Sequence, residues 1–335
     1  MDNILFHRYL IEERSYVSFI KREIHNLVKP VFNERRTGEV DIVVSEMCSN
    51  LIKYARKGEL LYRLSKEDDQ PVFEVICLDN GPGIKDINFF IKDGVSSRNS
   101  LGQGLGSIMR LSNFAQIYSK PDMGTIVYSK FYNDPEYIVP KNKLLVRSIN
   151  IAKPGESVSG DGLKARLLGN YSLFLIGDGL GHGPQAKEAI DRAISVFDET
   201  MSDDPAVIIR EINAGVKKTR GLVGTVVVLN HETKKGSMCG VGNISSRIQQ
   251  GLVSKNYTPN NGIIGMNIPT RIENFSFDLE KMQQLIFCSD GIRTKWDLIK
   301  YSGILKYDPM MLAAVLYKDN ARLTDDMTIL IIKTA

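Results

Sequence analysis

Acidic residues stand at four places in the sequence where an apolar, strand-like run meets glycine or another turn residue. Asp178 follows "YSLFLIG", Asp161 lies in "SGDG", Asp290 ends "LIFCSD", and Asp325 and Asp326 directly precede "MTILII". Aspartate oxygens are hard ligands that suit Mg²⁺ or Mn²⁺. Two such ions about 3.5 to 4 Å apart can clamp a phosphoryl group and lower the pKa of a bound water. The pattern therefore predicts a two-metal site that acts on a phosphoryl group.

The stretch "LIGDGLGHGPQAKEAI", residues 175–190, also has the glycine-rich form of a nucleotide phosphate loop. Such a loop needs N–H groups and a lysine, whereas converging carboxylates repel phosphate unless cations intervene. Without metal they would also raise each other's pKa and destabilise the fold. We therefore favour the metal site. His182 in this stretch could donate a proton to a leaving serine oxygen, but a structural role in the turn is favoured. Asn243 is a weaker candidate beside the metals.

A second set of candidate residues occupies the first third of the chain. Glu46 and Asn50 are spaced i and i+4 on a predicted helix, so they share one face. The turn "DNGPGI", residues 79–84, follows an apolar run, and Gly102, Gly104 and Gly106 open a further helical pattern. Each feature is common alone. Their order along the chain is what favours a nucleotide site.

The elements that must position these residues follow from the periodicity of apolar side chains. A period near 3.6 predicts helices over 16–36, 39–57, 185–200, 205–220 and 309–318. Short apolar runs bounded by turn residues predict strands over 71–79, 124–132, 143–152, 171–178, 224–230, 236–243, 271–279, 283–291 and 327–335. The two prolines and charges of "NDPEYIVPKNK" indicate a linker. We predict domains at 1–135 and 144–335, joined by a linker at 136–143.

The first set of motifs resembles the GHKL ATPase family. The series runs from an N-box helix to a strand with Asp-x-Gly-x-Gly, then a glycine lid and "GT" in a strand. The segment "VSEMCSNLIKYARKG" resembles the N-box of the RsbT/RsbW/SpoIIAB group of anti-sigma and switch-protein serine kinases, and the lid resembles the RsbT branch. This resemblance covers roughly residues 10–132.

The GHKL resemblance implies ATP and Mg²⁺ as cofactors and a role for each matching residue. Asp79 would accept a hydrogen bond from the adenine amino group, and Asn50 would bind Mg²⁺. Glu46 would take the proton from the attacking serine or threonine hydroxyl. The other implied nucleotide-binding residues are Gly81, Gly83, Gly102, Gly104, Gly106 and Thr125.

The motifs "SGDG", "GDGLGHG", "SDGI" and "DDMT" resemble the metal-dependent type 2C serine/threonine phosphatases, in the SpoIIE/RsbU/RsbX branch, and most of all RsbX. This resemblance covers residues 144–335. It implies two Mn²⁺ or Mg²⁺ ions, with Asp178 bridging both and the carbonyl of Gly179 joining it. The remaining implied ligands are Asp161, Asp290 and Asp325, the last being preferred over Asp326 because it occupies the first position of its motif.

Together the resemblances predict an α+β fold, in which a GHKL (Bergerat) α/β sandwich precedes a phosphatase-like β-sandwich flanked by helices. They imply a kinase and phosphatase acting on STAS-domain proteins, with a sigma factor or another switch protein as a further partner. The alternative is a phosphatase whose GHKL domain only binds and sequesters such a partner. A third reading, a sensor histidine kinase phosphorylated on His25 of "HNLVKP", is disfavoured because too few residues separate this motif from Glu46.

Composition sets limits on function. The 335 residues are 43% hydrophobic and 24% charged, with a net charge of +4, and no basic tract is dense enough to predict nucleic-acid binding. No apolar run approaches the roughly 20 residues of a membrane span, and the N-terminal residues do not resemble a signal peptide. The four cysteines form no CxxC pair and are expected to be reduced, buried thiols. We therefore expect a cytoplasmic protein, and homo-oligomerisation remains open.

Overall fold

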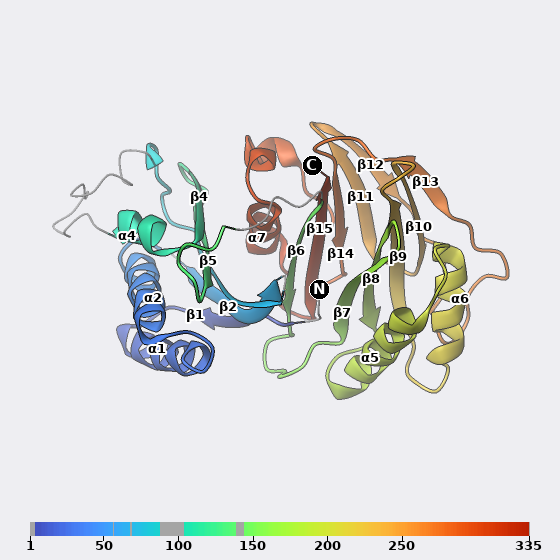
Figure 1. The fold of residues 1–335 in the computed structure, drawn as a ribbon, viewed down its shortest axis with the longest axis horizontal. Coiled ribbons are helices and arrows are strands. Elements are labelled where there is room, and N and C mark those ends of the chain that lie inside the picture. Colours follow the sequence, from blue (N-terminus) through green and yellow to red (C-terminus); the bar gives the residue numbers. More distant parts are fainter. Residues whose placement is uncertain (1–3, 56, 68, 88–103, 139–143, 335) are drawn as a thin grey trace. The chain divides into compact units, whose positions relative to one another are not determined.

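The computed structural model describes residues 4–55, 57–67, 69–87, 104–138 and 144–334. The chain forms two compact units (Figure 1): the first is Phe6–Lys141, and the second is Asn142–Ala335 together with Met1–Leu5. Three five-stranded sheets with antiparallel pairing and the helices packed on them confirm the predicted α+β class. No helix in the described segments is long and apolar enough to cross a membrane.

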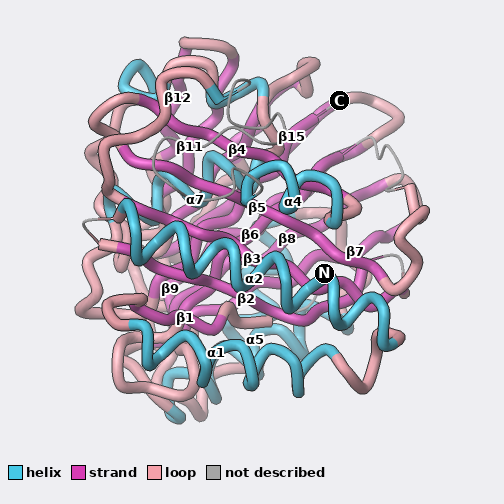
Figure 2. Tube along the Cα trace, turned by 90° about the vertical axis from the view of Figure 1, so that its left-hand side faces the viewer, coloured by secondary structure: helices cyan, strands magenta, loops and turns pink. Residues whose placement is uncertain are grey.

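The first unit is one sheet with helices on one face (Figure 2). The strand order is β1-β2-β3-β5-β4, and the strands are β1 His7–Leu10, β2 Gly58–Glu67, β3 Gln70–Asp79, β4 Phe114–Lys120 and β5 Gly124–Tyr132. The described helices are α1 Arg14–Val28, α2 Glu34–Tyr54 and α4 Gly104–Leu111. The core lies between helices and sheet, where Val40, Val44 and Met47 of α2 pack with Phe73 and Val127 of the sheet.

The first two helices divide at a proline. The prediction of one helix over 16–36 is wrong at its end, because α1 ends at Val28 and α2 begins at Glu34. Pro30 has no N–H to continue the helical ladder. Asn33 then starts α2, since its side-chain oxygen accepts a hydrogen bond from Arg36 N at 2.9 Å.

A buried arginine joins the elements that carry the first set of site residues. Arg36 in α2 is 2% exposed. Its guanidinium donates to the carbonyl of Tyr132 at the end of β5, at 2.7 Å, and to the carbonyl of Leu111 at the end of α4, at 2.6 Å. It also pairs with Glu39 at 2.6 Å and donates to Asn113. Arg36 therefore fixes α4 and β5 against α2.

The second unit is a sandwich of two sheets. One sheet has the order β13-β10-β9-β8-β7 and the other β12-β11-β14-β15-β6. The strands are β6 Leu144–Ile151, β7 Asp161–Leu168, β8 Tyr171–Gly179, β9 Leu222–Asn230, β10 Lys235–Val241, β11 Ser245–Gln250, β12 Val253–Tyr257, β13 Phe275–Asp278, β14 Gln284–Cys288 and β15 Met327–Thr334. Phe174 and Val227 of one sheet share a buried cluster with Phe287 and Leu330 of the other, so a core lies between the sheets.

Helices cover the outer faces of this sandwich (Figure 1). The helices α5 Pro184–Glu199 and α6 Pro205–Gly215 share a second core with β8 and β9, through residues such as Ile190, Ile209 and Val226. Helix α7, Pro309–Asn320, packs on β6 and β15. Two short 3-10 helices, Leu298–Tyr301 and Ile304–Lys306, precede it.

Helix α6 ends earlier than the pattern predicts. The apolar spacing indicated a helix over 205–220, but α6 ends at Gly215 and the next residues form a turn. Thr219 closes this turn, because its backbone N and its Oγ1 both donate to the carbonyl of Val216, at 2.9 and 2.7 Å. Threonine hydroxyls compete in this way with helical hydrogen bonds.

We expect Arg36→Ala to destabilise the first unit by about 2 to 4 kcal/mol, because it leaves the Leu111 and Tyr132 carbonyls and Glu39 without their buried donor. The matched control is Arg35→Ala, which removes an exposed arginine that pairs with the same Glu39 and should cost roughly 0.5 kcal/mol or less. Hydrogen exchange of β5 in the full chain, measured across a urea series, reports the difference. Equal losses in the two variants would contradict the role given to Arg36.

Candidate functional site

The structure brings the predicted acidic residues of the second unit to one end of the sandwich. Asp161 opens β7 and is paired in register with Asp178 near the end of β8. Asp290 follows β14, and Asp325 and Asp326 immediately precede β15. These strands belong to different sheets, so the site is formed where corresponding ends of the two sheets meet.

Asp161 is the most constrained of these residues. Its side chain has no exposed surface, and both carboxylate oxygens are buried without a hydrogen-bond partner. Burial raises the pKa of Asp161 to about 7; the nearby Ser289 hydroxyl opposes this in part, and the charge of Asp326 raises the pKa further. An ionised carboxylate in this position requires a compensating positive charge.

Asp178 faces the same conflict. Burial raises its pKa far above the ordinary value for aspartate, and the charges of the other four aspartates raise it further. The five carboxyl groups are thus close enough to act on one another electrostatically. In the described segments, however, no three His, Cys, Asp or Glu side chains already have the arrangement of a metal cage. The site is a cluster of carboxylates that repel one another. Their oxygens are suitable ligands for a divalent cation.

Asp325 and Asp326 have different surroundings. Both oxygens of Asp326 accept backbone hydrogen bonds, one from Lys153 N at 2.8 Å and the other from Gly160 N at 2.7 Å. Among the residues that the structure describes, Asp325 accepts only from the N–H of Asp326, at 2.9 Å, through one oxygen. Asp326 therefore anchors the segment that leads into β7, and Asp325 keeps the greater capacity for a ligand. This difference supports the choice of Asp325.

Two further polar residues extend the site. Asn243 Nδ2 donates to Asp290 Oδ2 at 3.1 Å, so this weak candidate orients a predicted ligand. His182 Nδ1 lies 2.8 Å from Glu156 Oε1. Burial raises the pKa of Asp326, and His182 is near enough to offset a small part of that rise. The sequence offered no signal for Glu156, which lies 26 residues before its partner.

Gly179 is fixed by a close approach of backbone. Its N–H donates to the carbonyl of Gly160 at 3.0 Å. A Cβ at this position would lie 2.3 Å from the carbonyl oxygen of Ala186 in α5. Only glycine fits, and the contact holds the turn after Asp178 against the helix.

In the first unit the predicted nucleotide loop leaves β3 at Asp79. Asp79 Oδ1 accepts from Gly81 N at 2.6 Å, which closes the turn. A Cβ on Gly83 would lie 1.9 Å from the carbonyl oxygen of Lys120, and one on Gly124, at φ +80°, would lie 1.9 Å from that of Asp79. The loop is therefore pressed against the β4–β5 hairpin.

The hairpin also contributes Thr125. Its Oγ1 lies 2.9 Å from Ser119 Oγ, and Ser119 Oγ accepts from Ile84 N at 2.7 Å. Thr125 is thus linked through one hydroxyl to the loop after Asp79. Ser119 was not predicted from the sequence, because an isolated serine in a strand carries no signal.

The half-buried Glu46 and Asn50 lie on α2 beside the start of α4. A Cβ on Gly104 would be 2.8 Å from Glu46 Oε2 and 3.8 Å from Asn50 Nδ2. Gly106 is buried two residues further along α4, which packs on α2. Gly102 lies outside the described residues. The structure thus places Glu46 and Asn50 close to the start of α4, where the later glycines lie. It separately connects Asp79, Gly81, Gly83 and Thr125 through the loop after β3 and the β4–β5 hairpin.

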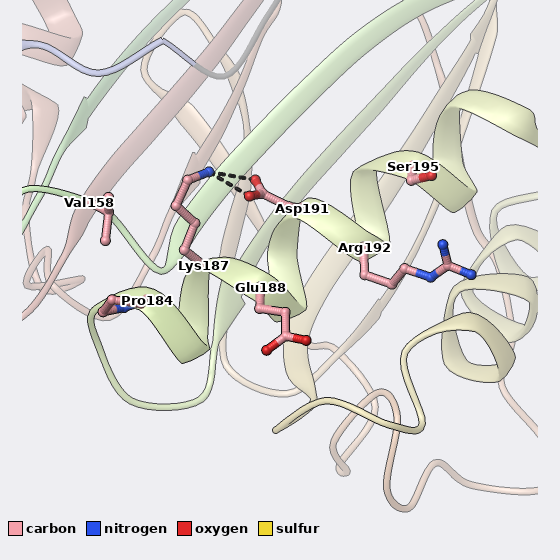
Figure 3. Close-up of a pocket in the computed structure, with 7 residues that line it drawn as sticks. All are labelled: Val158, Pro184, Lys187, Glu188, Asp191, Arg192 and Ser195. Carbon is pink, nitrogen blue, oxygen red and sulfur yellow. Dashed lines mark hydrogen bonds and ion pairs between the residues drawn. The ribbon is translucent and has the colours of Figure 1, made fainter.

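A shallow groove of about 470 Å³ lies on the outer face of α5 (Figure 3). It begins at Val158 and Pro184 and follows Lys187, Glu188, Asp191, Arg192 and Ser195. Lys187 and Asp191, one turn apart on α5, are paired at 2.6 Å. None of the predicted metal ligands lines this groove, so it is a separate feature of the surface.

The sequence of the second unit matches a known family. Residues 169–296 match the sequence model of "Stage II sporulation protein E (SpoIIE)". The second unit carries a SpoIIE-type phosphatase domain. The chain is also 26% identical over 149 residues to the phosphoserine phosphatase RsbX of Bacillus subtilis (strain 168), covering 44% of this chain and 73% of RsbX. The predicted resemblance to the SpoIIE/RsbX branch is confirmed.

The N-terminal region resembles the serine/threonine-protein kinase RsbT of Bacillus subtilis (strain 168), as predicted. That match is 31% identical over 86 residues and spans 26% of this chain and 65% of RsbT, slightly less than two thirds of its length. Among solved structures, RsbX in complex with magnesium aligns with a TM-score of 0.53 at 21% identity, covering 59% of this chain and 99% of that one. This likeness confirms a type 2C phosphatase-like fold for the C-terminal part.

The raised pKa values of Asp161 and Asp178 predict a pH-dependent instability of the metal-free protein. Both aspartates hold protons in the folded state at pH values where the unfolded chain, with pKa values near 3.9, has released them. The free energy of unfolding therefore falls as pH rises from about 4 towards the raised pKa values. We expect thermal unfolding of the second unit in chelator to show this fall, and added Mn²⁺ to reverse it.

The variant Asp178→Asn should flatten this pH profile and raise the melting temperature in chelator, because it removes one of the repelling charges. Asp191→Asn, an exposed aspartate on α5, is the matched control and should leave the profile unchanged. A wild-type profile that is flat between about pH 5 and 8 would refute the electrostatic account.

Proposed function

We propose that the chain is a bifunctional regulator of partner switching. Residues 144–335 act as a metal-dependent phosphatase on phosphoserine or phosphothreonine in a STAS-domain protein. Residues 1–135 act as a GHKL-type ATP-dependent serine/threonine kinase, with 136–143 as the linker. The observation that carries the phosphatase proposal is the fully buried Asp161, which interacts electrostatically with Asp178, Asp290 and Asp326.

The residues that would hold two Mn²⁺ or Mg²⁺ ions are Asp161, Asp178, Asp290, Asp325 and the carbonyl of Gly179. When bound, such ions neutralise the carboxylates, polarise the phosphoryl group and lower the pKa of water. The chain itself supplies the frame. Asp326 secures the approach to β7 through two backbone amides, and Asn243 orients Asp290.

The kinase proposal rests on the position of Gly104 beside Glu46 and Asn50. In this proposal the N-terminus of α4 favours the negative charge of the ATP phosphates, and Asn50 offers a neutral oxygen to Mg²⁺. Asp79 accepts a hydrogen bond from adenine. Glu46 takes the proton from the substrate hydroxyl at its carboxylate.

Opposed activities on one serine would hydrolyse ATP without net change. We therefore infer that the two units act on different sites or partners, or that binding of a partner favours one activity. The purified chain would contradict this inference if it phosphorylated and dephosphorylated the same serine at equal, partner-independent rates.

We expect Asp178→Asn to abolish Mn²⁺-dependent dephosphorylation of a phosphorylated STAS-domain protein, with a loss of at least about a hundredfold in kcat/KM. Asp178 would be one of the residues that hold the metal, and asparagine lacks the negative charge that this role needs. Asp191→Asn is the matched control and should retain wild-type rates. Phosphate-affinity electrophoresis follows the reaction, and dephosphorylation that survives in Asp178→Asn would remove the metal site.

We expect Glu46→Gln to lower phosphate transfer from ATP to a STAS-domain protein by about a hundredfold or more, while ATP affinity stays within a few-fold. The exposed Glu34 on the same helix gives the control Glu34→Gln. Transfer is followed by phosphate-affinity electrophoresis and ATP binding by calorimetry. If the wild type binds ATP and the partner without any transfer, the first unit is a binding module instead of a kinase.

A further inference from the structure

A rigid turn after α6 touches the loop that carries Asp178. Gly221 N donates to Thr219 Oγ1 at 3.1 Å, and Thr219 is bound in turn to Val216. The carbonyl of Gly221 accepts a hydrogen bond from Leu180 N at 3.1 Å. Leu180 is two residues beyond Asp178, so the backbone directly after Arg220 is held against the loop that follows Asp178.

The Arg220 side chain extends over this loop. Its Nη1 lies 3.0 Å from the position that a Cβ of Gly181 would occupy. Arg220 is exposed, and within the described part of the chain its guanidinium makes neither a hydrogen bond nor an ion pair. Some other basic side chains of this unit are paired, such as Lys164 with Asp198 at 3.1 Å and Arg147 with Asp308 at 2.9 Å. Arg220 thus presents an unpaired positive charge over Gly181, in the loop that follows Asp178.

A site made of carboxylates repels an anionic substrate electrostatically. A phosphate monoester is an anion, and each aspartate that is not neutralised repels it. A cation at the rim of the site reduces this repulsion. The planar guanidinium of arginine also offers parallel N–H donors that match phosphate oxygens. His182, the basic residue within the loop that follows Asp178, is already bound to Glu156.

We propose that Arg220 binds the phosphoryl oxygens of the substrate and positions the phosphate over the acidic cluster. The proposal rests on the phosphatase function proposed above and adds the group that recognises the phosphate. Arg220 makes this contact from the α6–β9 turn, and the hydrogen bond from Leu180 N to the Gly221 carbonyl holds that turn beside the loop after Asp178.

The test compares Arg220→Ala and Arg220→Lys with Lys218→Ala, which removes a positive charge from the same turn. Two quantities are measured on the full chain. The first is kcat and KM for a phosphoserine peptide in Mn²⁺. The second is the Kd of inorganic phosphate in Mg²⁺, by calorimetry. The calorimetric measurement does not depend on turnover.

We expect Arg220→Ala to raise KM and the Kd of phosphate by about ten- to a hundredfold, the range for a lost charge-assisted hydrogen bond. Arg220→Lys should recover part of this loss, because it keeps the charge without the planar donors. Lys218→Ala should stay within about twofold, as expected for an exposed charge.

Three results would overturn the proposal: no phosphate binding by the wild type, equal Kd values for wild type and Arg220→Ala, or an equal loss in Lys218→Ala. Failure of the phosphatase function looks different. In that case phosphate still binds through Arg220, but no turnover occurs with the wild type. Turnover that requires Asp178 and is indifferent to Arg220 would overturn only the role of Arg220.

Discussion

The repulsion among five carboxyl groups is the constraint on which the second unit depends. Asp161 is fully buried with no hydrogen-bond partner for either oxygen, and burial together with neighbouring charges raises the pKa of Asp178. A fold does not keep such an arrangement for stability, because each buried charge costs free energy. The sandwich core supplies the rigidity that holds the strand ends together, and the close packing of Gly179 on α5 prevents the turn from relaxing.

Two glycine-rich turns of similar sequence, one beginning at Asp178 and the other at Asp79, have different chemistry because different residues surround them. Asp178 meets Asp161, Asp290 and Asp325 across strand ends. Asp79 instead closes its own turn through Gly81 and lies against the β4–β5 hairpin. The first arrangement concentrates negative charge. The second leaves glycine backbone and, on the neighbouring helix, Glu46 and Asn50 beside the N-terminal end of α4, which suits an anionic nucleotide.

The sequence correctly predicted that the acidic residues lie at strand ends and that Glu46 and Asn50 share one helix face. Both features depend only on residue type and local spacing. Its errors have local causes. Pro30 divides a predicted helix, and Thr219 turns the chain after α6. The strands β2, β4, β7 and β11 carry too many polar residues to be recognised as apolar runs. Glu156, Ser119 and Arg220 gain their roles through contacts between distant segments, for which a single sequence gives no signal.

The central claim is that the strand-end aspartates of the second unit form a divalent metal site. Crystals of the full chain soaked with Mn²⁺ test it directly through anomalous scattering. The account predicts anomalous peaks contacted by Asp178, Asp161, Asp290 and Asp325, with Asp326 still bound to the amides of Lys153 and Gly160. The absence of any peak beside Asp178, with Mn²⁺ bound elsewhere on the chain, would contradict it.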